Sequence, residues 1–125
     1  MSLKHYKDYR KLVSLLKKKC PLAYPVSVRR RKLCNFYGDC SLQSKKFFIR
    51  INSSLNEAAA MDTLVHEWAH ARAWNHLHDN LSWEDFEERS HDASWGVAYS
   101  EVYKIYEQNF CDSAPSSGCG KFRIK

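Results

Sequence analysis

The chain has 125 residues and a formal net charge of +6 at pH 7. That length is enough for one hydrophobic core and too short for two independent ones. Its 44% hydrophobic and 14% aromatic residues argue against a disordered chain. We expect a single domain over residues 1–112 and a mobile tail over the Ser- and Gly-containing residues 113–125.

The sequence has no apolar run long enough to span a bilayer and no apolar signal segment near its start. We therefore expect a cytoplasmic protein without membrane association. The charge is unevenly divided, because residues 1–50 contain fourteen Lys and Arg against Asp8 and Asp39, whereas the remainder is acidic. Residues 1–50 are thus a candidate nucleic-acid-binding surface, with an ordinary solubilising surface as the alternative.

The N-terminal half predicts a helix followed by strands. Apolar residues at three- and four-residue steps predict a helix over residues 3–19, capped by Ser2 and ended by two prolines. Residues 26–33 predict a strand with a basic face, residues 35–39 a turn, and residues 46–52 the clearest strand. We expect these strands to form a small, mostly antiparallel sheet.

The C-terminal half predicts helices. Ser54 and Glu57 have the spacing of a capping box before a helix over about residues 56–75. A helical turn is expected over 82–85, and a long helix with an aromatic face over about 92–109. The expected fold class is therefore α+β, with an N-terminal helix, a small sheet and two longer helices.

Residues 66–70 read His-Glu-Trp-Ala-His and combine candidate metal ligands with a candidate general base. Two histidines four apart on a helix lie on one face and can bind one Zn²⁺. Glu67 lies between His66 and His70 and can act as a general base toward a water molecule. The pattern predicts a zinc-dependent hydrolase.

A catalytic zinc site needs a third protein ligand. His91, at the start of the last helix, is our preferred candidate. The segment between His70 and His91 is long enough to form a loop and return to the first two histidines. His76 is an alternative, but Ala73 replaces the glycine of the related H-E-x-x-H-x-x-G-x-x-H pattern. Acidic residues of the following segment form the third option: Glu84, Glu87 and Glu88.

The sequence offers alternatives for the residues that would support the metal and the reaction. Tyr99 or Arg72 could stabilise a developing oxyanion, and Asp62 or Asp92 could orient a metal-bound histidine. The five cysteines are odd in number and lack a C-x-x-C pair, which indicates free thiols rather than a disulfide framework. A structural zinc site is the alternative for four of them: Cys34, Cys40, Cys111 and Cys119.

Over about residues 45–110 the chain resembles the SprT-like zinc metallopeptidase domain. The resemblance rests on the strand ending at Asn52, on residues 63–70 (Thr-Leu-Val-His-Glu-Trp-Ala-His), and on His91 followed by Trp95-Gly96 and a Tyr-rich helix. It implies a small zincin-like fold with zinc on His66, His70 and His91 and Glu67 as the base. Asp92 replaces the glycine that often follows the third histidine, and the paired cysteines of the family's zinc ribbon are absent.

Three functions are therefore compared. The first is a zinc metallopeptidase acting on a protein or peptide substrate, in possible association with DNA. The second is a nucleic-acid-binding module with a mainly structural zinc site. The third is a zinc hydrolase of another amide substrate, such as a cell-wall peptide.

Overall fold

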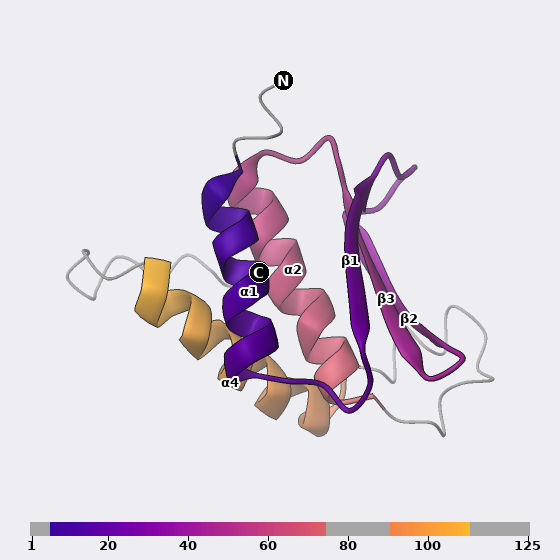
Figure 1. The fold of residues 1–125 in the computed structure, drawn as a ribbon, viewed down its shortest axis with the longest axis vertical. Coiled ribbons are helices and arrows are strands. Elements are labelled where there is room, and N and C mark those ends of the chain that lie inside the picture. The colour runs from indigo at the N-terminus through magenta and orange to yellow at the C-terminus, as the bar shows by residue number, and fades with distance from the viewer. Residues whose placement is uncertain (1–5, 75–90, 111–125) are drawn as a thin grey trace.

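The computed structural model describes residues 6–74 and 91–110, which form a three-stranded sheet with helices on one side (Figure 1). The elements are α1 (Lys7–Lys19), β1 (Val26–Arg31), β2 (Gly38–Gln43), β3 (Lys46–Asn52), α2 (Glu57–Arg72) and α4 (Ala93–Phe110). The expected α+β class, N-terminal helix and two longer helices are confirmed. None of the described helices has the length and apolarity needed to cross a membrane.

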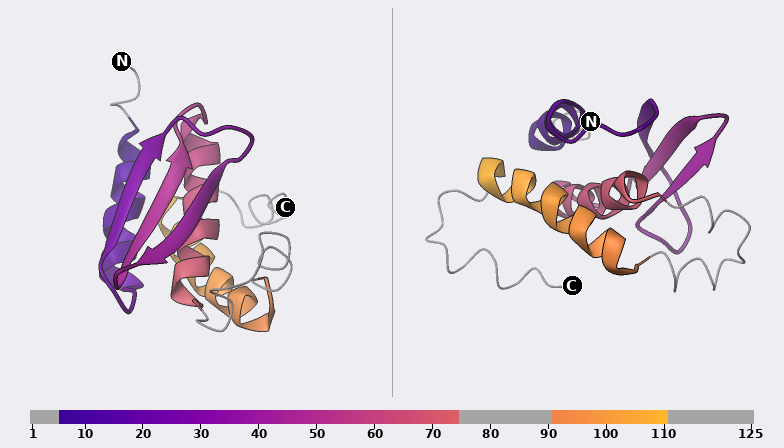
Figure 2. Two further views of the ribbon diagram at one scale, coloured as in Figure 1. Left: turned by 90° about the vertical axis from the view of Figure 1, so that its right-hand side faces the viewer. Right: turned by 90° about the horizontal axis from the view of Figure 1, so that it is seen from below.

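Helix α2 occupies the centre of the molecule. It contacts β2 and β3 on one side and helices α1 and α4 on the other, as the two views of Figure 2 show. Ten of its sixteen residues are buried, and the indole of Trp68 is fully enclosed. The Trp68 Nε1–H donates to the carbonyl oxygen of Cys20 at 2.9 Å, which satisfies its polar atom. A helix that is apolar on most sides is expected in such a position, and it provides a rigid base for side chains near its C-terminal end.

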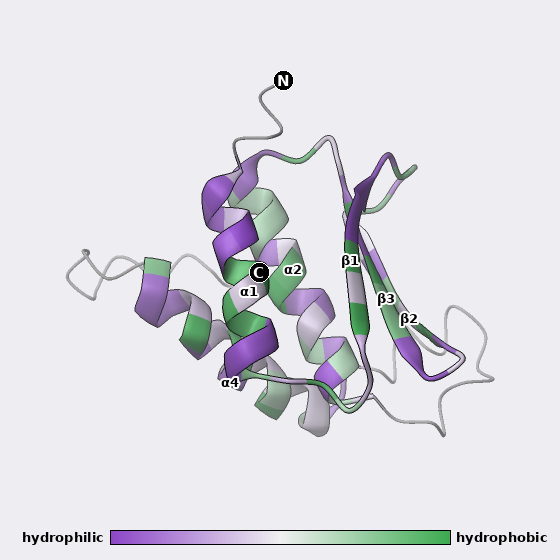
Figure 3. Ribbon diagram, in the orientation of Figure 1, coloured by the Kyte–Doolittle hydropathy of each residue, from purple (hydrophilic) through white to green (hydrophobic). Residues whose placement is uncertain are grey.

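The sheet is mixed, and our expectation of a mostly antiparallel sheet is wrong. The strand order is β1-β3-β2, with β1 parallel and β2 antiparallel to β3. Strand β3 is central, and Phe47, Ile49 and Ile51 face the helices with at most 1% of their surface exposed. The alternate residues therefore face away from the helices, which follows from the two-residue period of a strand. Figure 3 shows apolar residues in the first half of β1 and polar residues at its end.

The β2–β3 hairpin turns at Ser44 and Lys45, a connection that the sequence did not indicate. Both residues have positive φ, 52° and 62°, as a two-residue type I′ turn requires. Asn-Gly is the usual pair at these positions, because non-glycine residues incur a steric cost there. The connection is therefore held in place by the pairing of β2 with β3 rather than by the turn residues themselves.

Replacing the pair by Ser44→Asn and Lys45→Gly is expected to stabilise the protein. Relief of the left-handed conformation at Lys45 should raise the unfolding free energy by about 1 kcal/mol, which corresponds to an increase of about 4 °C or more in the melting temperature. Circular dichroism melting measures the effect. Lys46→Gly, one residue later in extended backbone, is the control and should lower the melting temperature; an equal rise in both variants would contradict the explanation.

The start of α2 differs from the capping box that we expected. The N-cap is Asn56, whose side-chain oxygen accepts a hydrogen bond from the backbone N–H of Ala59 at 2.8 Å. The Glu57 carboxylate instead accepts from the backbone N–H of Tyr9 at 3.0 Å and joins α2 to the first turns of α1. Ser54 bonds to Asn52 through its N–H and hydroxyl. Asn, Ser and Asp are similar as caps, so the local sequence does not separate these alternatives.

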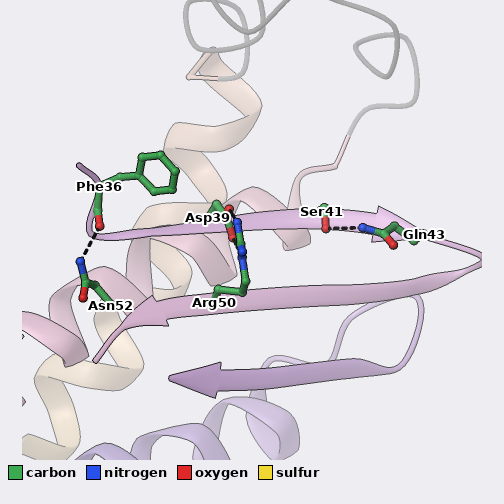
Figure 4. Close-up of polar contacts among 6 residues, drawn as sticks. All are labelled: Phe36, Asp39, Ser41, Gln43, Arg50 and Asn52. Atoms are coloured by element: carbon green, nitrogen blue, oxygen red, sulfur yellow. Dashed lines mark hydrogen bonds and ion pairs between the residues drawn. The ribbon is translucent and has the colours of Figure 1, made fainter. Parts of the chain in front are cut away.

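Asn52 fixes the connection between β1 and β2. Its side-chain Nδ2 donates to the carbonyl oxygens of Leu33 and Phe36 at 3.1 and 2.9 Å. Figure 4 shows the Phe36 contact and, farther along the same strands, the ion pair of Asp39 with Arg50. Asn52 thereby holds the segment that leads into β2, and β2 is the strand that passes beside the histidine-bearing helix.

Candidate metal centre

Helix α2 places His66, Glu67 and His70 near its C-terminal end. His66 and His70 are four residues apart and therefore lie on one face of the helix; their ring centroids are 4.9 Å apart. Both Glu67 and His70 are buried, with 8% and 9% of their surface exposed, and His66 is partly exposed. The spacing thus presents two imidazoles in one direction, as the sequence predicted.

His91 completes the group from a different part of the chain. It precedes α4, and its Nε2 atom lies 3.1 Å from Nε2 of His70 and 3.3 Å from Nε2 of His66. Candidate ligand atoms of the three residues all lie within 4.8 Å of one another. The structure therefore brings His91 to the pair, and the group could hold a metal ion.

The separations of the His91 nitrogen from its two neighbours match the requirements of a tetrahedral zinc site. Nitrogen ligands at 2.0–2.1 Å from zinc in tetrahedral geometry lie about 3.3 Å apart. The two measured Nε2–Nε2 distances, 3.1 and 3.3 Å, are close to that value. Three protein nitrogens also leave a fourth position for a water molecule or a substrate atom, which is typical of catalytic rather than structural zinc sites. The residues present therefore fit zinc.

The surroundings of His70 favour its neutral imidazole. Burial, followed by the charges of the neighbouring His66 and His91, lowers the pKa of His70 to about 3. Because metals bind neutral imidazole, His70 does not have to lose a proton at neutral pH. The facing nitrogen of His70 is thus poorly suited to a proton and available to a divalent cation.

Trp95 forms a wall of the candidate metal centre, a role that we did not assign from the sequence. Its ring centroid is 5.2, 5.7 and 4.8 Å from those of His66, His70 and His91. On its other side it stacks on Tyr99 at 5.0 Å. No specific signal for this contact was present in the sequence, because His91 lies before α4 and the pair does not belong to one helix. The indole restricts the rotation of the imidazoles around the site.

The Glu67 carboxylate lies close to strand β2. Burial raises the pKa of the Cys40 thiol well above its ordinary value, and the negative charges of Glu67 and then Asp39 raise it further. Cys40 is in the middle of β2 and pairs with Ile49 of β3. The general-base candidate therefore belongs to a helix that packs against an edge strand of the sheet, and its charge acts on that strand.

The predicted supporting residues have different surroundings. Arg72 donates to the carbonyl oxygen of Pro21 at 2.7 Å and to the Glu101 carboxylate at 3.4 Å, contacts that direct it toward α1 and α4. Asp92 accepts from the backbone N–H of Trp95 at 3.1 Å and so caps α4. Asp62 is exposed one turn before His66. Tyr99 is near the site through its stacking on Trp95 and stays a prediction as an oxyanion donor.

The remaining candidates lie outside the described residues. These are His76, the three glutamates, the helical turn over 82–85, Cys111 and Cys119. Cys34 is exposed and Cys40 partly buried, and neither forms a disulfide. Among the residues that the structure describes, the three histidines form the group suited to a metal ion. Comparison of the chain with models of protein families, with curated proteins and with solved structures finds no match.

Proposed function

We propose that the protein is a zinc-dependent metallopeptidase that hydrolyses peptide bonds in a protein substrate, as the resemblance to SprT-like domains implies. The observation that carries the proposal is the convergence of three imidazole nitrogens, two from α2 and one from the turn before α4, beside a buried carboxylate. A structural site would use a fourth protein ligand and would not need Glu67. The arrangement therefore favours a catalytic centre over the structural zinc of a nucleic-acid-binding module.

The residues of the proposed centre have different roles. His66, His70 and His91 would hold the ion. Zinc in such a site lowers the pKa of water toward about 7 and polarises a carbonyl group. Glu67 accepts a proton from the attacking water and later delivers it to the leaving amine.

A peptide is the substrate that the surroundings favour. Strand β2 is an edge of the described sheet, so one side of its backbone is unpaired by any described strand. An extended peptide can add to such an edge through main-chain hydrogen bonds. Because Cys40 of β2 lies near Glu67, a peptide paired with β2 would pass close to the proposed base. Other amide substrates, including cell-wall peptides, are the second candidate and would require the same backbone recognition.

Removal of the metal is expected to abolish hydrolysis reversibly. Purified protein treated with a chelator and dialysed should lose cleavage of fluorescein-labelled casein, and one equivalent of Zn²⁺ should restore it, because the histidines alone cannot activate water. Fluorescence release measures cleavage and elemental analysis measures zinc. Mg²⁺ serves as the control and should not restore activity, since it prefers oxygen ligands. Full activity in metal-free protein would contradict the proposal.

A further inference from the structure

The face of the sheet that points away from the helices is strongly basic. The buried residues of β3 face α2, so the alternate positions of all three strands face the other way. Four cations lie at these positions against one carboxylate, Asp39. The cations are Arg29, Arg31, Lys46 and Arg50, and all four are exposed. In Figure 1 the labelled helices lie on the opposite side of the sheet.

A groove runs along β1, at the edge of the sheet where this basic face borders α1. It has a volume of about 830 Å³, is open to solvent, and is lined by Lys17 of α1, residues 26–31 and Lys46. No carboxylate is among the described residues that line it. Arg29 and Arg31 are two residues apart on one strand, a separation of about 6.6 Å. The cations thus form a row along an edge strand rather than a single cluster.

Phe48 lies at the centre of the same face. The registers place Ser27 of β1 on one side of it and Ser41 of β2 on the other. Both neighbours are small, so the ring of Phe48 is partly exposed between them. Lys46 Nζ is 5.5 Å from the ring centroid. A central aromatic ring surrounded by cations can stack on a nucleobase while the cations contact phosphates.

We propose that the outer face of the sheet, with Arg29, Arg31, Lys46 and Phe48, binds single-stranded nucleic acid. Charge complementarity selects a polyanion, and the aromatic ring selects one with unstacked bases over a duplex or a lipid surface. Arg50 contributes less because Asp39 holds its guanidinium in an ion pair. The surface is separate from the histidine group, which lies on the helix side of the sheet. The inference therefore stands independently of the proposed peptidase activity.

The test compares two variants of equal net charge. Arg29→Gln, Arg31→Gln and Lys46→Gln together remove three charges from the sheet face. Lys7→Gln, Lys11→Gln and Lys104→Gln remove three exposed charges from α1 and α4. Fluorescence anisotropy of labelled oligothymidylate measures binding over a range of salt concentrations. We expect the sheet variant to bind at least about tenfold more weakly at low salt, and its log–log salt dependence to be shallower by about 2.

Phe48→Leu separates stacking from charge and is expected to weaken oligothymidylate binding by about fivefold or more without changing the salt dependence. Glu67→Gln should bind like the wild type, so loss of peptidase activity and loss of binding are distinguishable. Circular dichroism confirms that each variant is folded. Equal loss in both charge variants, absence of wild-type binding, preference for a duplex, or preference for vesicles of phosphatidylserine and phosphatidylcholine would each overturn the proposal.

Discussion

Replacing Glu67 with glutamine is expected to lower the rate of casein cleavage by about a thousandfold, the middle to upper part of the range for loss of a general acid–base group. The amide has nearly the same shape as the carboxylate but cannot accept a proton from water. Glu67 is buried on α2, with 8% of its surface exposed. Because the amide has nearly the same shape, the substitution should leave the surrounding packing unchanged. The effect should fall on kcat rather than on KM, because the lost interaction belongs to the chemical step.

Zinc content is the second measurement for Glu67→Gln and should equal that of the wild type, since the three histidines are retained. Glu107→Gln on α4 is the matched control and should leave both activity and zinc content unchanged. Cleavage by Glu67→Gln at a rate near that of the wild type would show that the carboxylate is not the base. Loss of zinc together with activity would instead show that Glu67 supports the metal.

The helices and the histidine pair followed from local sequence patterns. The HExxH spacing fixes two imidazoles on one face of any regular helix, and His91 was identified by the length of chain that separates it from His70. What joins them is tertiary: α4 packs across α2 and brings His91 to 3.1 Å from His70. The position of Trp95 depends on the same packing, because the docking of α4 on α2 turns its ring toward all three imidazoles.

The sheet was less predictable for equally physical reasons. Strand β2 reads Gly-Asp-Cys-Ser-Leu-Gln and contains no β-branched or aromatic residue, so it has weak strand propensity. Its place is set by β3 and by the close approach to α2 at Gly38, where a Cβ would lie 2.8 Å from the Thr63 methyl group. The parallel pairing of β1 with β3 depends on contacts between distant segments and leaves no periodic signal. Propensity thus predicted β3, whereas tertiary packing determined its partners.

His91→Ala is expected to weaken zinc binding by more than about a hundredfold, since loss of a residue that merely supports a ligand already costs 10–100-fold. Two imidazoles four apart on a helix remain in the variant, but they complete only half of a tetrahedral site. Cobalt substitution reports the change directly, because the visible spectrum of Co²⁺ depends on the number of its ligands. Competition with a chromophoric chelator measures the affinity.

His76→Ala is the matched comparison for His91→Ala, because His76 is the other histidine whose spacing from His70 could complete the site. The Nε2 distances of 3.1 and 3.3 Å from His91 to its two neighbours predict that His76→Ala keeps full zinc affinity. Since His91 is partly exposed and adds no apolar core, the metal-free forms of both variants should melt near the metal-free wild type. The reverse pattern, with zinc lost in His76→Ala and retained in His91→Ala, would move the third ligand to the segment after α2. That result would also show that metal binding does not require the docking of α4 on α2, on which the proposed centre depends.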